Sequence, residues 1–277
     1  MRAIAAGIVL LLLTIGPALA VELSGSLTQG ALITGTAPAG AAVAFEGRTL
    51  RVDPQTGTFV FGIGRDHDAD ATLMVTHPDG RVETKVLEIM SRQWRIERIN
   101  GLPPSKVTPP PEVLARIRRE GALISASRSR DTAAMAFADG FILPAKGRLS
   151  GFYGSQRILN GKPRRPHLGL DVAAPVGAPV HAAAAGEVVL AEADLFYTGG
   201  TVTIDHGHGL TTIYSHLNSV DVEVGVRVAQ GDFIGTIGAT GRATGPHLDW
   251  RINWFNVRLD PQLVLNNPLP SGEGGER

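Results

Sequence analysis

Short runs of β-branched and other apolar residues recur along the chain, and residues that favour turns separate them. Glycine and proline account for 34 and 18 of the 277 residues, whereas only 5% are aromatic. Asp-Pro-Gln-Thr-Gly at 53–57 and His-Pro-Asp-Gly at 77–80 are strong turn sequences. This pattern favours a mainly β protein over a helical bundle. We expect strands at 41–45, 58–63, 71–76, 82–89, 186–190, 200–205, 210–214 and 233–237.

A proline-rich stretch divides the chain into two parts. Residues 102–111 contain five prolines in ten positions, which enforces an extended linker. Before it, residues 22–91 have the strand and turn spacing of a sandwich of about seven short strands, and 94–99 could add one more. After it, a helix is expected to start at Pro110 or Pro111, because proline is favoured at the first helical position.

The predicted helix is amphipathic. Its apolar stripe includes Val113, Leu114 and Ile117, with Leu123 and Ile124 as further candidates, and the helical tendency extends to about Phe137 with an interruption at Gly121. Packing against a neighbouring domain explains such a helix better than contact with a membrane. Four charged residues are expected to face water: Arg116, Arg118, Arg119 and Glu120.

The first twenty residues are typical of a secretory signal peptide. Arg2 provides the positive start, residues 3–15 are apolar, and small residues precede an expected cleavage after Ala20. The apolar run is shorter than the roughly 20 residues that span a membrane. The chain has no cysteine, and its 26 basic residues balance 26 acidic ones, so neither disulfides nor nucleic-acid binding is indicated. We expect an exported protein, periplasmic rather than extracellular, with no stable membrane anchor after cleavage.

Six of the eight histidines lie between residues 167 and 247. They include three short motifs: His-Leu-Gly-Leu-Asp at 167–171, Tyr-Ser-His-Leu at 214–217 and Gly-Pro-His-Leu-Asp at 245–249. In a strand, residues i and i+2 share a face, so the imidazole and carboxylate of the last motif can point the same way. The first motif can likewise present both of its polar groups on one side. Such groups suit zinc or another divalent ion.

As a set, these motifs resemble those of the lysostaphin-type (LytM-like) zinc metalloendopeptidases, which act on peptidoglycan. The resemblance covers about residues 147–261. It implies an antiparallel β-sheet or barrel-sandwich domain. It also implies that His167 and Asp171 are zinc ligands, and that His216 and His247 are catalytic residues near the attacking water and the developing oxyanion.

One position departs from the family pattern. The family usually has a histidine as third zinc ligand where this chain has Asp249. Aspartate also binds zinc, so we expect one ion held by a histidine and two carboxylates. The lower charge of such a centre weakens its Lewis acidity and makes harder ions such as Mn²⁺ possible occupants.

The remaining polar residues of this region have less specific interpretations. His181 is expected to be packed within a strand, and the glycine-flanked pair His206 and His208 favours a hairpin turn over a metal pair. Three arginines precede the first motif and either bind substrate carboxylates or lie in a solvated loop: Arg157, Arg164 and Arg165.

The predicted organisation is a signal peptide at 1–20, a β-sandwich-like module at 21–101, a linker with its helix at 102–140, a metallopeptidase domain at 141–265 and a disordered tail at 266–277. The predicted function is that of a secreted zinc-dependent endopeptidase that hydrolyses cross-links or stem peptides of peptidoglycan. The alternative is a catalytically impaired family member that regulates cell-wall amidases by binding. An amidase or a division protein would then be its partner.

Overall fold

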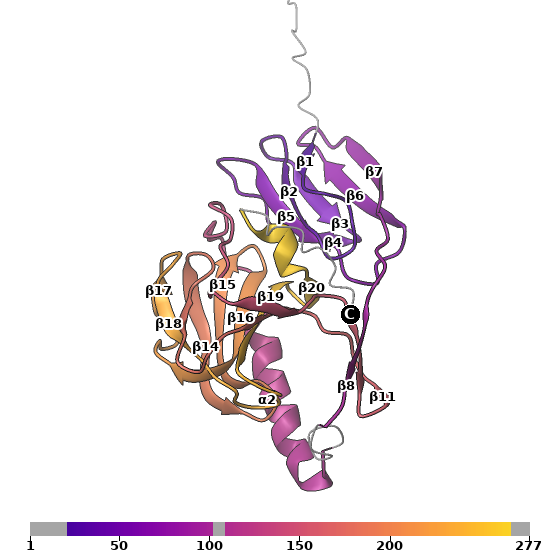
Figure 1. Cartoon of the computed structure of the whole chain (residues 1–277). Helices are drawn as coiled ribbons and strands as arrows, with labels where there is room; N and C mark the ends of the chain where they lie inside the picture. The colour runs from indigo at the N-terminus through magenta and orange to yellow at the C-terminus, as the bar shows by residue number, and fades with distance from the viewer. Residues whose placement is uncertain (1–20, 102–108, 267–277) are drawn as a thin grey trace, which may run out of the picture.

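The N-terminal part of the protein is a β-sandwich of two antiparallel sheets (Figure 1). The computed structural model describes residues 21–101 and 109–266. The sheets have the orders β1-β2-β5 and β4-β3-β6-β7. Phe45 stacks on Phe61 with ring centroids 4.1 Å apart, and alternate residues of β6 are buried. The strands are β1 (Glu22–Ser24), β2 (Leu32–Thr36), β3 (Ala42–Phe45), β4 (Arg48–Thr49), β5 (Thr58–Gly62), β6 (Asp70–Thr76) and β7 (Val82–Glu88).

The expected extra strand forms, but it pairs outside the sandwich. Strand β8 (Ile96–Ile99) runs parallel to β10 (Gln156–Leu159), which in turn pairs with β11 (Lys162–Pro163). This small sheet places Glu97 opposite Arg157. The chain therefore crosses to the C-terminal part before the proline-rich linker begins, as Figure 1 shows for β8 and β11.

The helix begins where proline predicts it and ends earlier than expected. A 3₁₀ turn η1 (Pro111–Val113) leads into α2 (Leu114–Ser127), so the extension to Phe137 was wrong. Beyond the helix, the backbone N–H of Ala136 donates to His206 O, and Thr132 O accepts from the N–H of His208. These tertiary hydrogen bonds fix the segment in an irregular path instead of a helical one.

Glu120 was also expected to face water but is buried. It is 8% exposed, because α2 packs on the sheet and its carboxylate accepts the backbone N–H of Phe196 at 2.7 Å. Arg116, one turn earlier on the helix, pairs with the same carboxylate. The buried charge is therefore both hydrogen-bonded and paired, as burial of a carboxylate requires.

The C-terminal part is built on one large sheet, which confirms the mainly β fold class. Its main path has the order β17-β14-β15-β16-β19-β12-β9, and β13, β18 and β20 branch from it. Strand β15 is buried along its whole length, so both of its faces are covered. The elements are β9 (Arg148–Gly151), β12 (Leu170–Ala173), β13 (Pro179–His181), β14 (Gly186–Leu195), β15 (Gly199–Gly207), β16 (Leu210–Val220), β17 (Arg227–Val228), β18 (Phe233–Ile237), β19 (His247–Trp254), β20 (Val257–Leu259) and the 3₁₀ helix η2 (Pro261–Val264).

The two parts pack against each other through β19, β20 and the segment that follows. Trp254 meets Phe45 edge-on at a centroid distance of 6.3 Å, and Arg92 pairs with the buried Asp260 at 2.8 Å. A single apolar cluster runs through both parts. The sandwich thus braces the strand that carries the last histidine motif.

Three predicted segments fall outside the described residues in whole or in part. They are the expected signal peptide at 1–20, linker residues 102–108 and residues 267–277 of the expected tail. Among the described residues, no helix has the length and apolar character needed to cross a membrane.

Candidate functional site

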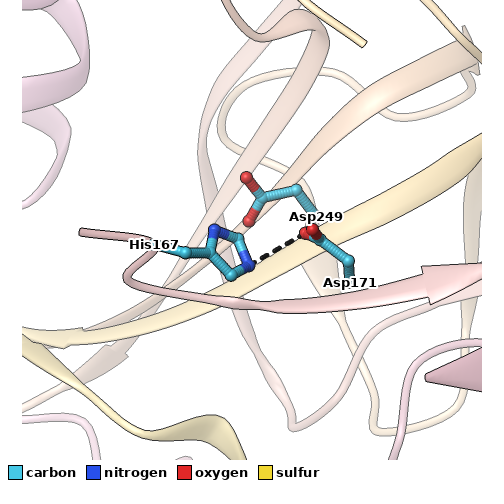
Figure 2. Close-up of side chains that lie close together, drawn as sticks. All are labelled: His167, Asp171 and Asp249. Carbon is cyan, nitrogen blue, oxygen red and sulfur yellow. Dashed lines mark ion pairs between the residues drawn. The ribbon is translucent and has the colours of Figure 1, made fainter. Parts of the chain in front are cut away.

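The three residues predicted as metal ligands meet at one point of the large sheet (Figure 2). Asp171 on β12 and Asp249 on β19 are direct partners in the antiparallel register, and His167 precedes β12 by three residues. Their ligand atoms all lie within 4.8 Å of one another. All three side chains are buried, with Asp249 only 2% exposed. Among the described residues this is the one cluster of its kind.

Two carboxylates that face each other across neighbouring strands repel, so this position requires positive charge close by. His167 Nε2 lies 3.0 Å from Asp171 Oδ1, yet both atoms are buried without a hydrogen-bond partner. Buried polar atoms left in this way cost about 1–3 kcal/mol each. A divalent ion between them would satisfy both, and the nitrogen and oxygen donors suit zinc. The residues therefore fit a metal ion.

Two arginines approach the same carboxylates. Arg251 grips Asp249 with both ends of its guanidinium: Nε lies 2.9 Å from Oδ1 and Nη2 lies 2.5 Å from Oδ2. Arg157 Nη2 lies 3.0 Å from Asp171 Oδ2. Burial opposes ionisation of Asp249, but Arg251 overcomes it and holds the pKa of this carboxyl well below its usual range. For Asp171 too, His167 and Arg157 outweigh burial and lower the pKa.

One of these arginines differs from its expected role, and the other carries no expectation from the sequence. Arg157 was expected to meet either substrate or solvent, and it instead pairs with Asp171 and lies 3.6 Å from Glu97 on β8. Arg251 lies outside the three sequence motifs. Its position two residues after Asp249 places it on the same face of β19, and this i, i+2 spacing is visible in the sequence.

Two glycines make room for the carboxylates. A Cβ on Gly169 would stand 2.5 Å from Asp249 Oδ1, and one on Gly151 would overlap Asp171 Oδ2. Neither glycine has a positive φ, so the space that they leave explains them better than backbone freedom does. Gly169 lies between His167 and Asp171, so the absence of a Cβ at this position lets the backbone approach Asp249 closely.

The two histidines predicted as catalytic lie side by side next to this cluster. The rings of His216 and His247 are 4.7 Å apart between centroids. With the Nδ1 proton in place, His216 donates to Thr240 O and His247 donates to Gly245 O, each at 2.8 Å. Both rings therefore keep Nε2 as the acceptor. His216 has a φ of 66°, a strained value for a residue with a Cβ, held by a bulge near the end of β16.

Burial determines the charge of His216. It lowers the pKa of this histidine to about 4, although Asp249 opposes the change. His216 is therefore neutral at pH 7 and available to accept a proton.

The histidines and carboxylates open into two hollows. The first, of about 530 Å³, is lined by Asp171, His216 and His247 together with the arginines Arg98, Arg148 and Arg157. The second, the helix-side cavity, measures about 360 Å³ and lies between α2 and the faces of β16, β19 and β20. His216, Arg157 and Arg242 line both, so the hollows meet at the reactive groups.

The other histidines of this region lie outside the cluster. His206 Nδ1 donates to Ala185 O and its Nε2 accepts from the Thr212 hydroxyl at 2.8 Å, so both nitrogens are used within the core. His208 has a φ of 51° in the turn between β15 and β16, which matches the expected hairpin. His181 contacts Gly231 O through Nδ1.

Comparisons with known proteins point to the same region. Residues 165–261 match the description Peptidase family M23. Peptidoglycan DD-endopeptidase ShyA of Vibrio cholerae is 39% identical over 105 residues, which are 38% of this chain and 24% of that protein. DD-carboxypeptidase/endopeptidase Mpg of Neisseria meningitidis is 44% identical over 109 residues, which are 39% of this chain and 24% of that protein. The chain thus spans about a quarter of the length of these relatives.

A solved structure extends the likeness beyond the matched segment. A crystal structure described as an M23 peptidase from Pseudomonas aeruginosa aligns with a TM-score of 0.68 at 29% identity. The alignment covers 86% of this chain and 94% of that one. The likeness therefore includes most of the N-terminal sandwich as well as the large sheet.

Proposed function

Because residues 165–261 belong to peptidase family M23, we propose that this chain is a metal-dependent endopeptidase that cleaves peptide bonds in peptidoglycan. The observation that carries the proposal is the meeting of His167, Asp171 and Asp249 beside the paired rings of His216 and His247. The names of the relatives ShyA and Mpg support the substrate class. Peptide cross-links and stem peptides are the bonds that such an enzyme would cut.

The metal would be held by His167, Asp171 and Asp249. When bound, a zinc or similar ion supplies Lewis-acid polarisation of the substrate carbonyl. A set of one imidazole and two carboxylates is harder than the two-histidine set, so Mn²⁺ belongs in the same tests as Zn²⁺.

The neighbouring histidines would accept and donate protons during hydrolysis. His216 is neutral at pH 7 and fixed by Thr240, so its Nε2 is in the correct tautomer to accept a proton from the attacking water. His247 is fixed in the same tautomer by Gly245, and its ring adjoins that of His216. One ring can therefore take up a proton from the water at Nε2, and the other, when it carries a proton on Nε2, can donate to the negative substrate oxygen.

The test is digestion of purified peptidoglycan by the full chain, with products separated by chromatography and metal content measured on the same sample. We expect soluble muropeptides from the Zn²⁺- or Mn²⁺-loaded protein and none after chelation. His216→Ala should abolish release, whereas His181→Ala, outside the cluster, should leave it unchanged. Metal-loaded protein that releases nothing, and instead stimulates an added cell-wall amidase, would overturn the proposal in favour of the regulatory alternative.

We also propose export to the cell envelope, because this substrate lies outside the cytoplasm and residues 1–20 have the pattern of a signal peptide. Fusion of residues 1–25 to a reporter that is active only after export tests this. Activity should appear with the native segment and disappear when charged residues interrupt the apolar run. Retention of the native fusion in the cytoplasm would contradict the proposal.

A further inference from the structure

Of the six arginines that line the helix-side cavity, three come from the end of α2 and the two neighbouring strands β19 and β20. Arg128 directly follows α2, Arg251 lies on β19 and Arg258 lies on β20. Arg258 pairs in register with Asn253, which shares a strand face with Arg251. All three line the cavity together with His216 and Asp249. The cavity is therefore strongly basic at the wall that adjoins the reactive groups.

Only one of these three charges is neutralised within the described residues. Arg251 is bound by Asp249. No described carboxylate lies within 4.0 Å of Arg128 or Arg258, whose side chains instead meet neutral amides. Arg128 Nη2 donates to Asn256 Oδ1 at a long 3.4 Å, and Arg258 Nη1 donates to Asn253 Oδ1. Arg128 Nε is buried without a partner.

The proximity of these arginines to one another disfavours their charged forms in the protein without a bound anion. Burial, reinforced by neighbouring arginines, lowers the pKa of Arg258 to about 9 and that of Arg128 to about 10. Both remain charged at pH 7. Half-buried like charges without a carboxylate within hydrogen-bond reach are the arrangement that an incoming anion stabilises, and the planar guanidinium matches a carboxylate geometrically.

Glu120, the acidic residue of α2 that lines the cavity, does not supply the missing charge. Its carboxylate is already occupied by the N–H of Phe196 and by Arg116 on the helix. The anion must therefore come from outside. Because the cavity reaches His216 and Asp249, an anion held there would lie beside the groups that are proposed to act on the substrate.

We propose that Arg128 and Arg258 bind a carboxylate group of the peptide substrate in the helix-side cavity. This inference rests on the proposed peptidase function, and it adds a substrate requirement: a free carboxylate near the scissile bond. Arg251 adds to the positive electrostatic potential of the cavity while it remains bound to Asp249. The helix α2 forms the opposite wall of the subsite through Ile117 and Ile124.

The experiment uses the full chain without metal, so that binding is separated from hydrolysis. Calorimetry compares N-acetyl-D-Ala-D-Ala with its C-terminal amide. We expect the acid to bind at least about tenfold more tightly, since charge-assisted bidentate hydrogen bonds are lost in the amide. Arg128→Gln and Arg258→Gln should each remove most of that preference. Arg119→Gln is the matched control, because Arg119 is exposed on α2 and does not line the cavity.

Thermal unfolding separates ligand binding from a structural role. Loss of one of several crowded like charges should leave Tm unchanged or raise it, whereas loss of a structural arginine should lower it. Equal binding of acid and amide, or an equal loss in Arg119→Gln, would overturn the subsite. Inorganic phosphate that binds as tightly as the acid, with the same arginine dependence, would overturn its assignment to a peptide carboxylate. Carboxylate binding without hydrolysis would contradict the peptidase proposal and leave the subsite standing. Hydrolysis without a preference for the carboxylate would contradict the subsite and leave the peptidase proposal standing.

Discussion

The space beside Asp249 sets the position of this carboxylate, and a single methyl group tests that reasoning. In Gly169→Ala, the new Cβ would stand 2.5 Å from Asp249 Oδ1, 2.8 Å from Arg251 Cγ and 2.9 Å from Trp250 O. Ordinary contact begins at 3.4 Å, so the carboxylate or the backbone must move by 3.4 − 2.5 = 0.9 Å. Metal ligands tolerate displacements of only about 0.2 Å.

We therefore expect Gly169→Ala to weaken zinc binding by about 10- to 100-fold, the loss typical of misplaced ligand support. Overpacking should also lower the free energy of unfolding by about 1–3 kcal/mol. Affinity is measured by competition with a chromophoric chelator, and folding by circular dichroism and Tm. Gly245→Ala is the matched control, because a Cβ there meets nothing within 4 Å. Unchanged zinc affinity in a folded Gly169→Ala protein would refute the placement of Asp249 in the metal site.

Two further substitutions test the electrostatics. Arg251→Met frees Asp249 from a bidentate partner. Because hydrogen bonds to charged groups are worth about 1.5–3 kcal/mol, zinc affinity in the same competition assay should rise by about tenfold or more. A fall in zinc affinity would show that Arg251 positions Asp249 instead. Burial holds the pKa of His206 at about 4 instead of 6.5, so the unfolded chain binds a proton that the folded chain refuses. Stability should be complete above pH 6.5 and fall by about 3 kcal/mol as the pH drops towards 4. In denaturant titrations, His206→Gln should flatten this dependence over that range, and an equal slope in both proteins would assign the pH effect to other groups.

The strands could be predicted because local chemistry decides them. In β6 the alternation of buried and exposed residues is visible in the sequence, and the turn at 53–57 is held by Asp53, whose carboxylate accepts the N–H groups of Gln55 and Thr56. Strand β8 shows the limit of such reasoning. Its extended character is local, but its parallel pairing with β10 depends on residues about 60 positions away.

The site residues likewise include some whose arrangement follows from local spacing and some whose arrangement depends on long-range pairing. Spacing within the motifs was enough to predict that His167 and Asp171 point together, and parity on β19 predicts the shared face of His247 and Asp249. The pairing of Asp171 opposite Asp249 depends on the register of β12 and β19 in the folded sheet, which local spacing does not determine. The amphipathic pattern misplaces Glu120 because it describes only the helix, whereas the burial of Glu120 follows from its contact with the N–H of Phe196 in the turn between β14 and β15.

The charge balance of the site explains how it can form before any ion binds. Two facing carboxylates would repel, yet each has one guanidinium, so the set of Asp171, Asp249, Arg157 and Arg251 is neutral. An incoming dication therefore competes with arginines for the same oxygens. If it displaces Arg251 from Asp249, that guanidinium becomes a third donor in the wall formed with Arg128 and Arg258. Occupation of the metal site and of the carboxylate subsite would then favour each other, because a single side chain joins both equilibria.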